Sequence, residues 1–199
     1  MELILPKKKQ FILPQAYNKI LLFGISGSGK STTADTLSKT SGIPCFHSDL
    51  HRFIMCGDNL VLTRPYENYF RELKSFINNN NDRWIVDYTS AWNDTQTLEW
   101  LINIAKPDLL LNFDLNEIDA LLGCKKRIEK FATLGEKPIG IPIPPGREYI
   151  NTLDVNLSLL KLYQHKQQKI SRLLNQFSGK IETFKTPNDR DNFIVSYLK

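Results

Sequence analysis

The sequence contains no apolar run long enough to cross a membrane. A transmembrane helix needs roughly 18 consecutive apolar residues, whereas the apolar runs here, such as ILLF at 20–23, are short. The first residues, MELILPKKKQ, do not resemble a secretory signal, because the lysines follow the apolar stretch and a proline interrupts it. We therefore expect a cytoplasmic protein without a membrane segment.

The sequence is also poor in cysteine. Cys45, Cys56 and Cys124 are odd in number and widely spaced, and none belongs to a C-x-x-C pair. This pattern argues against a disulfide framework and against a zinc site. We expect reduced thiols with structural roles.

Long charged runs are missing too, although the net charge is +5. The visible basic clusters are KKK at 7–9 and KKR at 125–127, and no aromatic residues interleave with them as a stacking platform for nucleic acid. A solvated surface explains the first cluster well. The charge is compatible with DNA as a partner, but an enzyme that handles phosphate needs cations as well.

What the chain does contain is a regular alternation of strand and helix patterns over 199 residues without an internal repeat. Short apolar runs predict buried strands, and helical periodicity lies between them. We predict an α/β three-layer sandwich with a five-stranded parallel sheet, helices on both faces and a site at the carboxyl ends of the strands. Residues 1–17 would be an extension, and 18–199 one domain. The predicted strands are 19–23, 44–47, 84–88, 108–113 and 180–184.

The stretch GISGSGKST at 24–32 follows the first predicted strand and precedes a helical segment. Its G-x-x-x-x-G-K-S spacing is that of a phosphate-binding loop, in which backbone N–H groups surround phosphate oxygens, Lys30 reaches the β- and γ-phosphates, and the Ser31 hydroxyl binds Mg²⁺. The sequence therefore predicts ATP and Mg²⁺ as ligands. The predicted nucleotide-binding residues of the loop are Gly24, Ser26, Gly27, Ser28, Gly29, Lys30, Ser31 and Thr32.

Motifs of other nucleotide-binding enzymes are missing. The sequence has neither the N-K-x-D nor the D-x-x-G motif of GTPases. Tyr88 follows Asp87 and Leu115 follows Asp114, where motor and transporter ATPases commonly carry a glutamate that activates water. This pattern favours phosphoryl transfer to a bound acceptor over hydrolysis.

Two aspartates follow predicted strands. Asp87 ends WIVD and is the expected carboxylate for the metal, together with Ser31. Asp49 follows the second strand and is a candidate to bind or deprotonate the acceptor hydroxyl, although a helix-capping role is equally compatible with its position. His47 and His51 flank Asp49, and we expect both to line the core or the pocket wall.

A basic helical segment after the fourth strand gives way to the Gly- and Pro-rich sequence ATLGEKPIGIPIPPGR. We predict a lid over about 116–148 that excludes water and places Arg127 or Arg147 on the transferring phosphate. The alternative is a solvated basic helix.

From about Asn18 onward the chain resembles the adenylate-kinase-like group of small P-loop kinases, and within it the DNA topology modulation proteins. GISGSGKST, HSDLHRF, DRWIVDYTS and PDLLLNFD carry the resemblance. It implies a nucleoside monophosphate kinase-like fold with a lid and ATP-dependent phosphorylation. It also implies that Lys185, Thr186 and Pro187 lie beside the adenine. Tyr88 departs from the pattern, because those proteins usually have glycine there.

We thus predict an ATP- and Mg²⁺-dependent kinase of a small, nucleotide-like acceptor, as a monomer or homodimer. The catalytic residues would be Lys30, Asp49, Asp87, Arg127 and Arg147. Two alternatives remain open at this point. One is a kinase acting on hydroxymethylated pyrimidines in DNA, and the other is a regulatory ATP-binding module without an acceptor.

Overall fold

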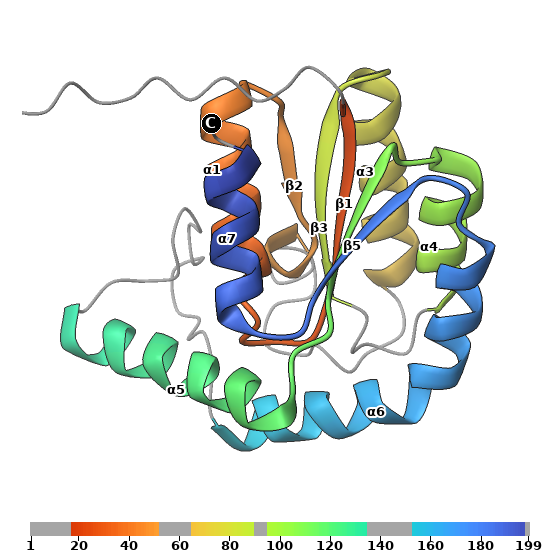
Figure 1. Ribbon diagram of the computed structural model, residues 1–199. Helices are drawn as coiled ribbons and strands as arrows, with labels where there is room; N and C mark the ends of the chain where they lie inside the picture. The colour runs from red at the N-terminus through yellow and green to blue at the C-terminus, as the bar shows by residue number, and fades with distance from the viewer. Residues whose placement is uncertain (1–16, 52–64, 90–94, 135–152, 198–199) are drawn as a thin grey trace, which may run out of the picture.

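A computed structural model describes residues 17–51, 65–89, 95–134 and 153–197 (Figure 1). Its centre is a five-stranded sheet with the order β2-β3-β1-β4-β5, in which every neighbouring pair is parallel. The predicted α/β fold class is therefore confirmed. The strands are β1 (Lys19–Gly24), β2 (Cys45–His47), β3 (Trp84–Thr89), β4 (Leu109–Phe113) and β5 (Lys180–Phe184).

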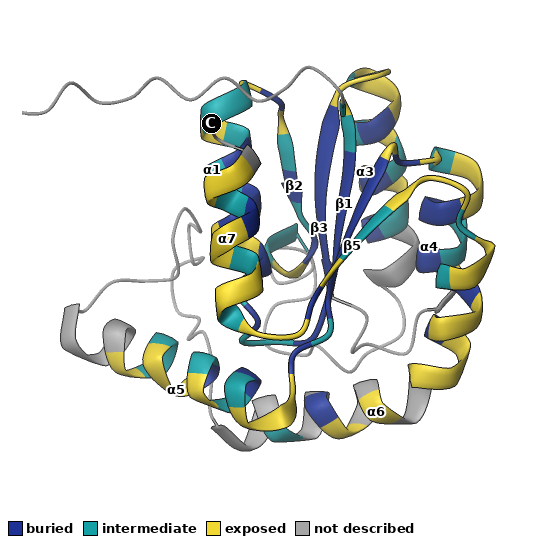
Figure 2. Cartoon of the chain, in the orientation of Figure 1, coloured by how far each residue is buried: buried dark blue, intermediate teal, exposed yellow. Residues whose placement is uncertain are grey.

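The inner strands consist of nearly continuous apolar residues because helices cover both faces of the sheet. Figure 2 shows β1 and β4 buried along almost their whole length, whereas β5 at the edge mixes exposed and buried positions. Burial of these strands contributes to the hydrophobic driving force for folding.

Helices form the two outer layers, with α1 and α7 on one face of the sheet and α3, α4 and α6 on the other (Figure 1). Aromatic contacts support this arrangement, since Phe184 of β5 lies against Phe193 of α7 and Phe46 of β2 against Phe76 of α3. The helices are α1 (Lys30–Ser41), α3 (Pro65–Asn79), α4 (Thr95–Trp100), α5 (Glu117–Leu134), α6 (Leu153–Gln176) and α7 (Pro187–Tyr197). None of the helices in the described part of the chain is long and apolar enough to cross a membrane.

The start of α7 is the one that the sequence TPND predicts. Thr186 Oγ1 accepts a hydrogen bond from the Asp189 N–H (3.1 Å), and Asp189 Oδ2 accepts one from the Thr186 N–H (2.9 Å). Pro187 is the first helical residue. This reciprocal arrangement is a capping box, and it fixes the direction in which the chain leaves β5.

Sequence periodicity did not predict the helical segment between β3 and β4. Here α4 continues directly into a five-residue π-helical turn, η1 (Leu101–Ala105), which ends at Lys106 with a positive φ of 49°. The segment is too short and irregular to display a long 3.6-residue repeat, although Leu98, Leu101 and Ile102 are buried. It covers part of the sheet face that α6 also covers.

The register of the strands separates the side chains of the site between the two faces. Asp87 of β3 pairs with Leu22 of β1, and both project toward α1. The next register position contains Tyr88, Phe23 and Asn112, which project toward α6 because successive side chains of a strand alternate. The carboxyl end of the sheet therefore presents two different surfaces.

Candidate functional site

The loop 24–29 connects β1 to α1 in a conformation that glycine makes accessible. Gly27 has φ 80° and Gly29 has φ 88°, values that side-chain-bearing residues rarely adopt. Helix α1 begins at Lys30 immediately after Gly29, so its free N–H groups face the loop. A helix N-terminus behind a glycine-rich turn is a ready anion site, as the sequence predicted for this segment.

Lys30 is held inside this loop. Its side chain is buried (5% exposed), and Nζ donates to the Ile25 carbonyl oxygen at 2.8 Å. Burial lowers the pKa of the Lys30 ammonium, and the charges of Asp87 and Asp49 oppose that effect. The same Ile25 carbonyl oxygen accepts a hydrogen bond from Ser28 Oγ at 2.8 Å, which is a second hydrogen bond within the loop.

Asp87 lies at the carboxyl end of β3 and is 4% exposed. Its Oδ2 accepts a hydrogen bond from His47 Nδ1 at 3.1 Å, and His47 Nε2 lies 3.0 Å from Asp35 Oδ1. The imidazole thus joins one carboxylate from β3 to another from α1. Burial alone would raise the pKa of Asp87, but the bond from His47 and the charge of Lys30 hold it below its usual range.

His47 carries a positive charge in this arrangement. Burial alone would lower its pKa, but hydrogen bonds with Asp87 and Cys45 outweigh that effect and raise the pKa of His47 to about 11. The ring is therefore an imidazolium at neutral pH. Its charge offsets the cost of burying Asp87 as an anion.

A second oxygen of Asp87 remains for a ligand. Asp87 Oδ1 is buried and has no hydrogen-bond partner in the described part of the chain, and the nearby Ser31 hydroxyl helps to lower the pKa of the carboxyl group. Among the described residues, no group of three or more His, Cys, Asp or Glu side chains is arranged so that it could hold a metal ion. One carboxylate and one hydroxyl fit Mg²⁺, which keeps several waters and takes further oxygens from nucleotide phosphates.

Sequence reasoning placed His47 in the core or the pocket wall and missed its contact with Asp87. The signal was available in part, because His47 and Asp87 each lie where a parallel strand ends. Only the register, in which His47 pairs with Asp87, brings them together. His51 stacks on Phe46 (4.0 Å between ring centroids) and contacts Glu72.

Asp49 lies in a helical turn at 48–51 and is exposed. It is close enough to Lys30 for its charge to raise the pKa of the ammonium. The preceding residue, Ser48, is buried, and its hydroxyl donates to the backbone oxygen of Asp87 at 2.5 Å. Asp49 therefore faces solvent at the edge of the site, on the segment that Ser48 attaches to β3.

Helix α5 rests directly on the phosphate loop. A Cβ atom at Gly27 would overlap Cys124 Sγ, and one at Gly123 would overlap the Gly27 carbonyl oxygen, so the two backbones touch. One helical turn further on, Arg127 Nη2 donates to Ser26 Oγ at 3.2 Å. The structure thus brings Arg127 to the loop. Arg147 and the whole of the predicted lid beyond Leu134 lie outside the described residues.

A second arginine, which sequence reasoning did not consider, contacts the loop from the other side. Arg190 of α7 donates from Nη1 to the Ser28 carbonyl oxygen at 3.4 Å and forms an ion pair with Asp191 at 2.6 Å. Lys185 and Thr186 lie just before this helix, and Pro187 is its first residue. Their backbone N–H groups at 185 and 186 bind Asp189, so a place beside the adenine stays a prediction for them.

Comparison with known proteins adds similarity in fold. No family model matches the sequence, and no curated protein matches it. A deoxyadenosine kinase from M. mycoides, solved with bound dCTP, is 15% identical and aligns over 89% of this chain and 97% of its own, with a TM-score of 0.43. An unliganded sugar kinase from Janibacter sp. HTCC2649 is 14% identical over 92% of this chain and 94% of its own, with a TM-score of 0.49. This chain is similar to both kinases at the level of the fold alone.

Proposed function

We propose that this protein is an ATP- and Mg²⁺-dependent kinase that transfers the γ-phosphate to the hydroxyl group of a small acceptor. The observation that carries the proposal is the convergence of Lys30, Ser31 and Asp87 on one glycine-rich loop at a helix N-terminus. These groups match what phosphoryl transfer needs: hydrogen-bond donors for the phosphate oxygens, a cationic side chain, and a carboxylate that binds the metal ion.

In this proposal the loop and α1 bind the phosphates of ATP through backbone N–H groups. Lys30 leaves the Ile25 carbonyl for the β- and γ-phosphates, and the loop keeps its bond from Ser28. Ser31 and Asp87 would hold Mg²⁺, which would offset the negative charge of the phosphates. Arg127 already touches Ser26 and is positioned for the charge that develops on the transferring group.

The transfer itself requires one acceptor hydroxyl and one base. The hydroxyl oxygen forms a bond to the γ-phosphorus while the bond from that phosphorus to the ADP oxygen breaks. The hydroxyl proton passes to the Asp49 carboxylate and then to water, so ATP and an alcohol give ADP, a phosphate ester and a proton. The absence of a glutamate after Asp87 or Asp114 supports transfer over hydrolysis.

The experiment is transfer of labelled γ-phosphate from ATP to nucleosides, nucleotides, sugars and DNA, with Mg²⁺ and with EDTA. We expect a Mg²⁺-dependent product with a small acceptor, and Asp87→Asn should need more Mg²⁺ for the same rate. Asp82→Asn is the matched control, because Asp82 is exposed and pairs with Lys19.

Two results would contradict the proposal. One is release of free phosphate at the same rate with and without every acceptor, because a kinase should accelerate when the acceptor fills the site. The other is transfer to DNA alone with a steep salt dependence, which would select the DNA-acting alternative.

A further inference from the structure

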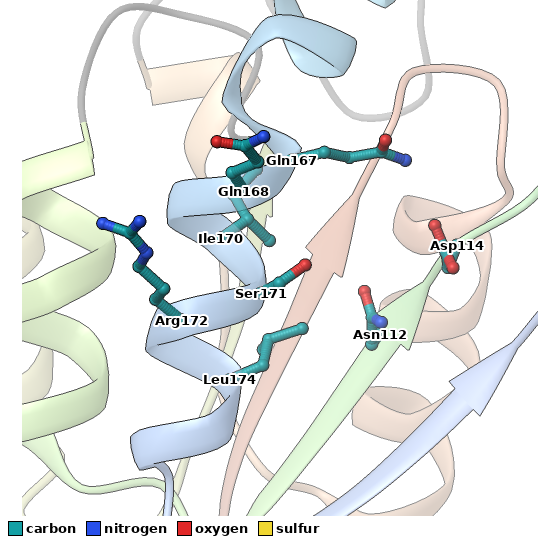
Figure 3. A pocket seen from close by; sticks show the side chains of 8 residues that line it. All are labelled: Asn112, Asp114, Gln167, Gln168, Ile170, Ser171, Arg172 and Leu174. Atoms are coloured by element: carbon teal, nitrogen blue, oxygen red, sulfur yellow. The ribbon is translucent and has the colours of Figure 1, made fainter.

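A hollow of about 640 Å³ lies between the carboxyl end of β4 and α6, on the face of the sheet opposite α1 (Figure 3). Its volume falls within the range of small-molecule sites, about 300–1,000 Å³. None of the catalytic, nucleotide-binding or metal-binding residues that we predicted from the sequence lines this hollow. The lining residues are Asn112, Asp114, Gln167, Gln168, Ile170, Ser171, Arg172 and Leu174.

Asn112 is an unusual residue for its position in the sheet. It interrupts the apolar run of β4, its side chain is 7% exposed, and its Oδ1 has no hydrogen-bond partner among the residues that the structure describes. Leaving a buried polar atom unpaired costs roughly 1–3 kcal/mol. An apolar residue would suit the fold better here, so the amide is best explained by a ligand that it binds.

Further polar side chains line the hollow beside Asn112 and could also form hydrogen bonds with a ligand. Figure 3 shows Gln167 reaching from α6 toward Asp114, with Ser171 between Gln167 and Asn112, while Arg172 lies on the other side of the helix. Carboxylate and amide oxygens accept hydrogen bonds from hydroxyl groups. A phosphate beside Asp114 would instead meet a like charge without a cation directed at it from the lining residues.

The hollow lies at the same carboxyl edge of the sheet as the phosphate loop. Asn112 pairs with Phe23, and the next residue, Phe113, pairs with Gly24, the first residue of the phosphate loop. The hollow therefore opens beside the start of the loop. Lys30 and Asp87 lie across the sheet from it, so the hollow does not overlap the site proposed for phosphate and metal.

We propose that this hollow binds the acceptor and that the acceptor is an unphosphorylated molecule with several hydroxyl groups, of nucleoside or monosaccharide size. The inference rests on the proposed kinase function and narrows it, because it excludes nucleoside monophosphates as acceptors. Asn112 and Asp114 accept hydrogen bonds from hydroxyl groups, and Ile170 and Leu174 provide apolar contact on the α6 side.

The test measures binding by calorimetry for 2′-deoxynucleosides and monosaccharides, each beside its own monophosphate, with a non-hydrolysable ATP analogue measured separately. We expect at least one unphosphorylated probe to bind about tenfold or more tightly than its monophosphate. Asn112→Leu should weaken that binding about tenfold, in line with an unpaired polar group. It should leave affinity for the ATP analogue unchanged. Gln167→Ala is a second variant that avoids the buried strand, and Asn175→Ala, exposed on the same helix, is the control.

The outcomes separate this inference from the proposed function. Tighter binding of monophosphates, no binding of any probe, or full affinity in both Asn112→Leu and Gln167→Ala would overturn the inference. The kinase function would still stand if γ-phosphate transfer occurs. Binding that depends on Asn112 without any transfer from ATP would support the hollow as a ligand site and overturn the kinase function.

Discussion

The two faces of the sheet differ sharply where the strands end. On the α1 face, Lys30, His47 and Asp87 are buried or half-buried charges with protein partners, and Asp87 Oδ1 is the atom that the described residues leave for a ligand. On the α6 face, Asn112 has an oxygen without a partner among the described residues, and it borders a hollow lined by amides and a hydroxyl group together with the charged side chains of Asp114 and Arg172. One face is electrostatically organised before any ligand arrives, and the other leaves its hydrogen-bonding capacity open.

This difference suggests that, at one edge of the sheet, one face would bind the nucleotide and metal and the other face would bind the acceptor. Fixed charges favour a group whose charge is large and constant, such as a triphosphate with its metal. Open hydrogen-bonding groups select an acceptor by its shape and hydroxyl pattern, because an analogue that lacks a partner leaves them unpaired. Substitutions on the α1 face should therefore alter nucleotide and metal use, and substitutions on the α6 face should alter acceptor use.

The largest expected effect comes from Lys30→Met, which keeps the aliphatic stem and removes the charge. We expect phosphoryl transfer to fall by about 10³-fold, as for other groups that stabilise transition-state charge. The fold should persist because Ser28 still bonds the Ile25 carbonyl. The measurement is transfer rate together with circular dichroism, and Lys39→Met, on the exposed side of α1, is the control. An unchanged rate would refute the assignment of the phosphate loop.

The next effect tests the ionic cluster. His47→Gln keeps a donor near Asp87 but removes the charge, and we expect the Mg²⁺ concentration for half-maximal rate to rise about tenfold or more, the usual range for partners of metal ligands. Binding of Mn²⁺ in the presence of an ATP analogue, followed by electron paramagnetic resonance, should weaken in parallel. His51→Gln is the matched control, because that ring stacks on Phe46 away from Asp87. A shift in acceptor KM with unchanged metal dependence would contradict the proposed division between the faces.

A smaller effect is expected on the opposite face. Ser171→Ala removes one hydroxyl from the hollow, and a neutral hydrogen bond contributes about 1 kcal/mol, so the acceptor KM should rise roughly fivefold. The Mg²⁺ dependence and the KM for ATP should not change. Steady-state kinetics with the acceptor found by the transfer assay measure all three quantities. A larger change in KM for ATP than for the acceptor would show that the hollow belongs to the nucleotide.

The smallest expected effect is on how the thermal stability of the metal-free protein depends on pH. The pKa of His47 is raised from 6.5 to about 11, so its ion pairs with Asp35 and Asp87 stabilise the fold fully below 6.5 and lose that contribution as the pH rises toward 11. The Cys45 thiol also faces this ring. The melting temperature of wild type minus that of His47→Gln should therefore shrink between about pH 7 and about pH 9.5. A difference that grows over this interval would contradict a charged His47.

Local sequence patterns predicted the scaffold well. The apolar runs located β1 to β5 within a residue or two, and TPND predicted where α7 begins. These features depend on neighbours in sequence, such as a capping side chain or a run of apolar residues. The π-helical turn at Leu101–Ala105 was not predicted, because such a turn has no simple periodic pattern of apolar residues.

The contacts that build the site were harder to predict because they join distant segments. His47 and Asp87 are 40 residues apart, and Arg190 and Ser28 are 162 residues apart. Each contact depends on strand register or helix packing, which a single sequence does not display. Asn112 was hidden for a related reason, since it lies inside the apolar run of β4 and only the fold shows that a hollow opens there. The predicted lid loop and Arg147 stay predictions, because they lie outside the described residues.

The direct contact between Gly27 and Gly123 also has a mechanical consequence. Because backbone touches backbone there, no side chain separates α5 from the phosphate loop, and any side chain added at either position would have to displace one of the two. Even alanine at either glycine should therefore push α5 away from the phosphate loop, and we expect the Arg127 guanidinium to lose its hydrogen bond to Ser26.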